Sequence, residues 1–115
     1  MAQAKTLSQA ELDQVLEYVS TKKYALRDRA IILTSFLGGL RVAEIASLTM
    51  GDVVNPDGSI KNEIRLSAAQ TKGKYPRTVF VSQRLQVELA NYLTTRHAKG
   101  ADIPFFHTDN RLRFT

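Results

Sequence analysis

An apolar run that ends at two glycines limits the possible folds of this chain more than any other segment. Residues 25–37 fit a helix whose charged side chains are confined to its first turns, and from Ala30 onward almost no polar face remains. A helix that is apolar on all sides usually lies at the centre of a core. Gly38 and Gly39 end it, because glycine adopts the left-handed geometry of a helix C-terminus without steric cost. The sequence therefore predicts a central helix followed by a sharp break.

Three further helices are predicted around this one. The segment from Ser8 to Glu11 is a capping box, and apolar residues recur behind it at helical spacing to about Ser20. A short helix spans roughly residues 41–48, and a last one is capped by Ser82 and runs to about His97.

Two strands are expected in the middle of the chain. Residues 55–58, Asn-Pro-Asp-Gly, have the composition of a turn. Apolar and polar residues then alternate over 60–66 and again over 78–81, and Lys72-Gly73-Lys74 lies between the two runs, which favours a β-hairpin. The expected fold class is α+β and mainly α, a helical bundle with a small antiparallel β-sheet, and the length allows one modest core.

Composition excludes several classes of protein. There are no cysteines, so disulfides and cysteine-ligated metal sites are excluded. No apolar run is long enough to span a membrane, and the N-terminus lacks the apolar core of a secretion signal. The two histidines, His97 and His107, have no carboxylates at metal-ligand spacing, and no phosphate loop or dinucleotide fingerprint is present. We therefore expect neither a metal nor a cofactor, and a cytoplasmic location.

Positive charge is concentrated in the second half of the chain. The net charge is +5, and residues 61–99 carry eight basic residues against two acidic ones. A polyanion facing this segment would explain the distribution, and a solvated basic surface would explain it equally well.

Arg41 is the first candidate site residue, because it follows the glycine break directly. A guanidinium binds two phosphate oxygens at once, and small residues such as Gly39 let a phosphodiester approach closely. Glu44 lies one helical turn later and could hold Arg41 in place. The alternative is an ordinary surface pair of Arg41 and Glu44.

The second candidate is Lys72 at the predicted hairpin tip. An amine there could reach a DNA groove and donate a proton to a departing alkoxide. Lys74, Tyr75 and Arg77 follow it, and Arg65 precedes it on the neighbouring strand. The alternative for this segment is a solvated, lysine-containing turn.

Taken together, these blocks resemble the first half of the catalytic domain of tyrosine recombinases, the phage integrase and Xer-like family, over residues 6–115. Residues 7–12 resemble the family's opening motif, residues 39–48 resemble the box with its first catalytic arginine, and residues 71–81 resemble its β-hairpin. The resemblance places the arginine at Arg41 and the catalytic lysine at Lys72. Since the matching sequence begins within ten residues of Met1, no separate core-binding domain is expected.

The resemblance implies site-specific DNA recombination or integration for a phage or mobile element, through a metal-free 3′-phosphotyrosyl intermediate. Arg41 would stabilise the phosphate, Lys72 would protonate the 5′-oxygen and Glu44 would brace the site. The contacts to double-stranded DNA would come from Gly39, Arg65, Lys74, Tyr75 and Arg77. The host would be bacterial or phage-derived, and self-association on DNA is expected.

The family's remaining catalytic residues, a His-x-x-Arg box, a further His or Trp and the tyrosine, have no counterpart in this chain. None of its four tyrosines, Tyr18, Tyr24, Tyr75 and Tyr92, matches the position of the nucleophile. The chain alone is therefore expected to be inactive. Two other interpretations stay open: a non-catalytic DNA-binding or regulatory module of the same fold, and a helical protein-interaction domain whose basic face is incidental.

Overall fold

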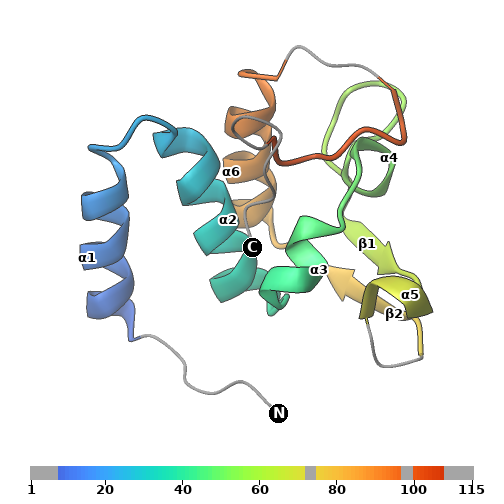
Figure 1. Cartoon of the computed structure of the whole chain (residues 1–115), viewed down its shortest axis with the longest axis horizontal. Helices are drawn as coiled ribbons and strands as arrows, with labels where there is room; N and C mark the ends of the chain where they lie inside the picture. The colour runs from blue at the N-terminus through green and yellow to red at the C-terminus, as the bar shows by residue number, and fades with distance from the viewer. Residues whose placement is uncertain (1–7, 72–74, 97–99, 108–115) are drawn as a thin grey trace.

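The computed structural model describes residues 8–71, 75–96 and 100–107 of the chain. Within them the expected fold class is confirmed, since helices predominate beside one small antiparallel sheet (Figure 1). No helix in these ranges is long and apolar enough to cross a membrane. The elements are α1 (Gln9–Val19), α2 (Ala25–Gly38), α3 (Val42–Ala46), α4 (Met50–Val53), β1 (Glu63–Leu66), α5 (Ala68–Thr71), β2 (Arg77–Phe80) and α6 (Gln83–Leu93).

Helix α2 is the central helix that the apolar run predicts. It packs between α1 and α6, and Ala30 and Leu33 are buried in the core (Figure 1). Other apolar side chains of α2, Ile31, Ile32 and Phe36 among them, are only half-buried against that core. The core therefore leaves part of this apolar helix uncovered.

A two-point ion pair fixes α2 against α6. Nε and Nη2 of Arg29 donate to the two carboxylate oxygens of Glu88 at 2.8 and 2.9 Å. The hydrogen bond from Arg29 lowers the pKa of Glu88, and the bond to Glu88 raises the pKa of Arg29. Both groups are therefore charged at neutral pH, and the planar contact sets how the two helices cross.

Two short helices, α4 and α5, are not among the predicted elements. Each begins with a reciprocal cap: Thr49 and Asp52 exchange backbone-to-side-chain bonds at the start of α4, and Ser67 and Gln70 do so at the start of α5. The two strands pair antiparallel as the predicted β-hairpin requires, and α5 lies within their connection, which was expected to be a turn.

The sheet separates its side chains onto two faces. Ile64 lies opposite Val79 and Leu66 opposite Arg77, and the three apolar members of these pairs are buried. The neighbouring pair, Arg65 and Thr78, points to the other face, because side chains alternate along a strand. Arg65 and Arg77 therefore lie on opposite faces of the sheet.

The first strand is shorter than predicted, since β1 begins at Glu63 and Ile60 forms an isolated bridge with Val54 instead. Helix α3 is also shorter than predicted. Helix α6 ends at Leu93 with Thr94 as its C-cap, before the predicted limit near His97. The helix and strand propensities of the residues do not define where these elements begin and end, because caps and tertiary contacts set the boundaries.

An extended segment after α6 closes one end of the core. The backbone amides of Met50 and Gly51 donate to the carbonyls of Ile103 and Ala101, each at 2.8 Å. Phe105 and Phe106 are buried from this segment and pack against the Tyr92 ring of α6, at centroid separations of 5.4 and 5.2 Å. The segment thus joins α4 and α6 into one core.

Candidate functional site

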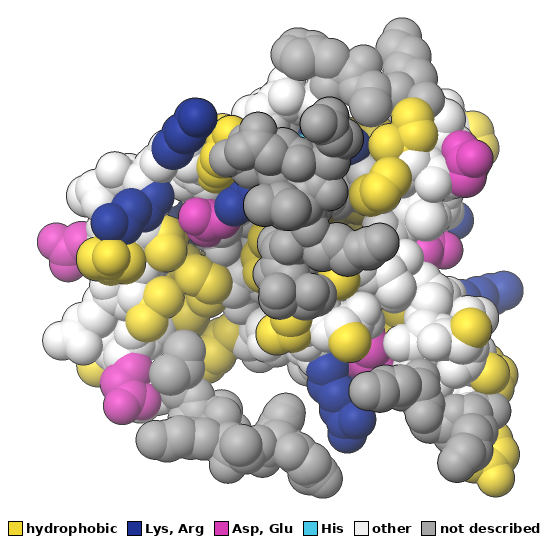
Figure 2. All heavy atoms as spheres, in the orientation of Figure 1, with side chains coloured by type: hydrophobic (Ala, Val, Ile, Leu, Met, Phe, Trp, Pro, Cys, Tyr) yellow, Lys and Arg dark blue, Asp and Glu magenta, His cyan; other side chains and the backbone are white. Residues whose placement is uncertain are grey.

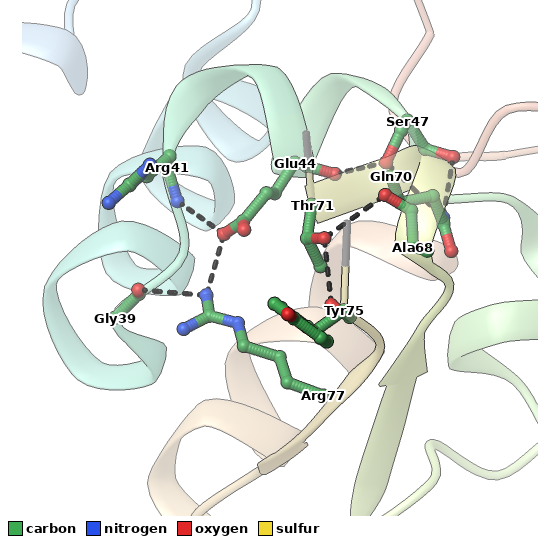
Figure 3. Close-up of polar contacts among 9 residues, drawn as sticks. All are labelled: Gly39, Arg41, Glu44, Ser47, Ala68, Gln70, Thr71, Tyr75 and Arg77. Carbon is green, nitrogen blue, oxygen red and sulfur yellow. Dashed lines mark hydrogen bonds and ion pairs between the residues drawn. The ribbon is translucent and has the colours of Figure 1, made fainter. Parts of the chain in front are cut away.

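Arg41 stands at the start of α3, directly after the break that ends α2. Gly39 takes the left-handed conformation there, with φ 73°, and Arg41 is the extended N-cap residue of α3. Its side chain is exposed, and its guanidinium makes no hydrogen bond or ion pair with another described residue. Figure 3 shows this guanidinium directed away from Glu44. The break therefore presents a free cationic fork to solvent.

Glu44 is the buried centre of the site, with a side chain that is almost inaccessible (residue exposure 4%). Its Oε1 accepts two hydrogen bonds, one from the Arg41 backbone amide at 3.0 Å and one from Arg77 Nη2 at 2.6 Å (Figure 3). A buried carboxylate needs such partners, because an unpaired buried charge is costly. Glu44 thus fixes the backbone of Arg41 and leaves the Arg41 side chain free, which differs from a surface pair of the two side chains.

Arg77 reaches this carboxylate from the first position of β2. Its side chain is 45% exposed, and the same Nη2 lies 3.5 Å from the Gly39 carbonyl oxygen. One guanidinium nitrogen therefore contacts the Gly39 carbonyl and the carboxylate that accepts from the Arg41 amide. The contact depends on the sheet register, which turns Arg77 toward the same face as buried Leu66.

Lys72 and Lys74 lie outside the described residues, but the chain on either side of them is held close to α3. The Thr71 hydroxyl contacts the Tyr75 carbonyl oxygen at 2.9 Å, and Thr71 itself is buried. On the same short helix, the Gln70 amide donates to the Ser47 carbonyl at 3.2 Å (Figure 3) and to an Asp52 carboxylate oxygen at 3.1 Å. The two residues that flank the lysines, Thr71 and Tyr75, are therefore joined to each other, and Gln70 ties α5 to the end of α3.

Gln70 and Thr71 are the positioning residues that sequence reasoning missed. A detectable signal was present, because Ser67-Ala68-Ala69-Gln70 has the spacing of a capping box. That pattern predicts a helix start immediately before Lys72. The tertiary contacts of Gln70 with Ser47 and Asp52 are not readable from any local pattern.

The remaining candidates are exposed and do not form one surface. Arg65 is 83% exposed on the face of the sheet opposite Arg77. Tyr75 is exposed just before β2. Figure 2 likewise shows basic side chains spread among acidic and hydrophobic ones on the face in view. Among the residues that the structure describes, no group of three or more His, Asp or Glu is placed to hold a metal ion.

Several proteins of known description are similar in sequence to this chain. The chain is 31% identical over 107 residues to the tyrosine recombinase XerA of Pyrococcus furiosus, covering 93% of this chain and 34% of that protein. It is 30% identical over 100 residues to transposase A from transposon Tn554 of Staphylococcus aureus, covering 84% of this chain and 27% of the transposase.

Structural comparison gives the same fold. A crystal structure of XerA recombinase matches with a TM-score of 0.68 at 22% identity, over 100% of this chain and 38% of the other. The chain thus spans about a third of the length of the relatives it matches. Residues 5–112 match the model of the phage integrase family. With nearly its whole length matched, the chain belongs to the phage integrase family.

Proposed function

We propose that this chain is the N-terminal part of a catalytic domain that cuts and rejoins DNA at specific sites. The observation that carries the proposal is the Arg41 guanidinium, which has no partner among the described residues, on a backbone that buried Glu44 holds in place. An arginine with a free guanidinium and a fixed backbone is suited to hold a phosphate in one orientation. Family membership supplies the reaction class.

In the proposed reaction a tyrosine hydroxyl attacks the scissile phosphorus, and the bond from phosphorus to the 5′-oxygen breaks. The tyrosine becomes joined to the 3′-phosphate, and the departing 5′-oxygen takes a proton from Lys72. Arg41 neutralises the charge that develops on the non-bridging oxygens. A 5′-hydroxyl of the partner strand then reverses the step. The nucleophile in this proposal is none of the four tyrosines of this chain.

The proposed DNA contacts extend beyond Arg41. Lys74 and Tyr75 would meet the DNA backbone just before β2, and Arg65 would meet it from the face of the sheet opposite Arg77. Gly39 contributes open space, since a Cβ added at this position would have no atom within 4 Å beyond its chain neighbours. Such contacts are made to backbone phosphates and carry no sequence preference of their own. The site of action would be the cytoplasm, where bacterial and phage DNA is found.

Salt dependence of duplex binding tests the DNA contacts. With Arg41, Arg65, Lys72 and Lys74 each on one phosphate, the slope of log K against log salt should be about −3.6, at about −0.9 per phosphate. Fluorescence anisotropy of a labelled duplex at four salt concentrations measures it. Arg84→Gln, a change at an exposed position of α6, serves as the charge control and should leave the slope unchanged. Absence of binding at low salt would reject the proposal.

We also propose that copies of the chain associate on DNA through apolar surface of α1 and α2. Figure 2 shows exposed hydrophobic side chains over these helices. Tyr18 on α1 and Leu26 on α2 are both exposed. Patches of this kind are typical of interfaces. Sedimentation velocity at rising protein concentration, with and without duplex, should show dimers or larger species, and Leu26→Gln should reduce them. A single monomer peak throughout would contradict this.

A further inference from the structure

Arg77 pairs with the carboxylate that also holds the backbone of Arg41. Its Nη2 is within 2.6 Å of Glu44 Oε1, and that same oxygen receives the Arg41 amide at 3.0 Å. Glu44 Oε1 therefore connects β2, through Arg77, to the backbone of Arg41. No other ion pair of Glu44 with a described residue competes for this position.

We propose that Arg77 is a positioning residue, which fixes the backbone of Arg41 relative to β2 by pairing with Glu44. The inference rests on the proposed function only for what Arg41 then binds. Without the Arg77 cation, the buried Glu44 carboxylate lacks its ion-pair partner, so it turns toward water and its bond to the Arg41 amide weakens. The Gly39 carbonyl also loses its contact with Nη2, so the turn before Arg41 loosens.

The alternative role for Arg77 is a direct phosphate contact, and the two roles give opposite results in a double-mutant cycle. If Arg77 acts through Arg41, then the single variant Arg77→Gln weakens duplex binding by roughly fivefold to tenfold near 0.1 M salt. When Arg41 is already Gln, adding Arg77→Gln should change the duplex affinity by no more than about twofold. If Arg77 holds a phosphate itself, the two losses multiply and the salt slope falls by about a further 0.9.

Glu44→Gln separates the two roles by the direction in which the duplex affinity changes. If Arg77 binds a phosphate, removing the Glu44 charge that competes for Arg77 should strengthen binding. It should weaken binding if the pair of Glu44 and Arg77 holds Arg41, because a neutral amide cannot retain the guanidinium. Tighter binding by Glu44→Gln therefore overturns the proposal. Glu44 is buried and Arg77 is half-exposed, so Glu44→Gln carries a greater risk of misfolding than Arg77→Gln. The two variants are therefore measured separately.

A third measurement needs no DNA. In the free chain, the backbone amide resonance of Arg41 should shift, and its hydrogen exchange should accelerate, in Arg77→Gln. Arg77→Lys, which keeps a cation beside Glu44, should return both toward wild type, and Arg84→Gln should not alter them. An unchanged Arg41 amide in Arg77→Gln refutes the positioning role. A wild-type chain that binds no duplex refutes the proposed function instead, and the amide result still decides the role of Arg77.

Discussion

Arg41→Ala, made in a protein that contains this chain together with the family's His-x-x-Arg box and tyrosine, is expected to slow DNA cleavage by about 10²–10³-fold. Binding of the duplex should weaken far less, because the contact of Arg41 with the non-bridging oxygens strengthens as charge develops in the transition state. The rate of covalent complex formation on a nicked suicide substrate measures the chemical step, and anisotropy measures binding. Equal losses in both would mean that Arg41 only binds.

Lys72→Ala is the informative comparison in the same assay. Its cleavage rate should recover on a 5′-bridging phosphorothiolate, whose sulfur leaves without a proton, and Arg41→Ala should not recover. The 115-residue chain alone should form no adduct. An adduct mapped to any of its own tyrosines would require a different active site. Loss of binding in Arg41→Ala, with no cleavage by the wild-type extended protein, would favour the non-catalytic DNA-binding module.

Phe106→Ala is expected to destabilise the chain by about 3–5 kcal/mol, the usual cost of removing a buried aromatic ring. Phe106 is 2% exposed and packs against Phe105 and Tyr92, with a centroid separation of 4.9 Å to Phe105. Since a domain of this size is stable by about 5–15 kcal/mol, the variant loses a large share of its stability and should unfold at a clearly lower urea concentration than the wild-type chain. Urea denaturation followed by circular dichroism measures the change in the free energy of unfolding.

The matched control is Phe80→Ala, which removes the same ring from the surface. Phe80 is 72% exposed on β2, so its loss should change stability by no more than about 0.5 kcal/mol. Similar destabilisation by the two variants would show that the segment carrying Phe106 does not close the core.

Local sequence determined the parts of this fold whose stabilising groups are neighbours in the chain. The capping box at Ser8, the central apolar helix and the left-handed glycine at position 39 all appear as the sequence predicts. Each depends on residues within one or two helical turns, so spacing and composition suffice to identify them. The antiparallel pairing of the two strands also appears as alternation and the short connection between them predict, although its partners are further apart in the chain.

Tertiary structure alone decided how the candidate residues relate to one another. Sequence spacing predicted a contact of Glu44 with Arg41, yet the cation beside its carboxylate is Arg77, 33 residues away along the chain. Gln70 likewise reaches Ser47 and Asp52 across the fold. Such partners depend on the strand register and on how α3 and α5 pack. A one-residue shift of β2 would turn Arg77 to the opposite face and leave Glu44 buried without its cation.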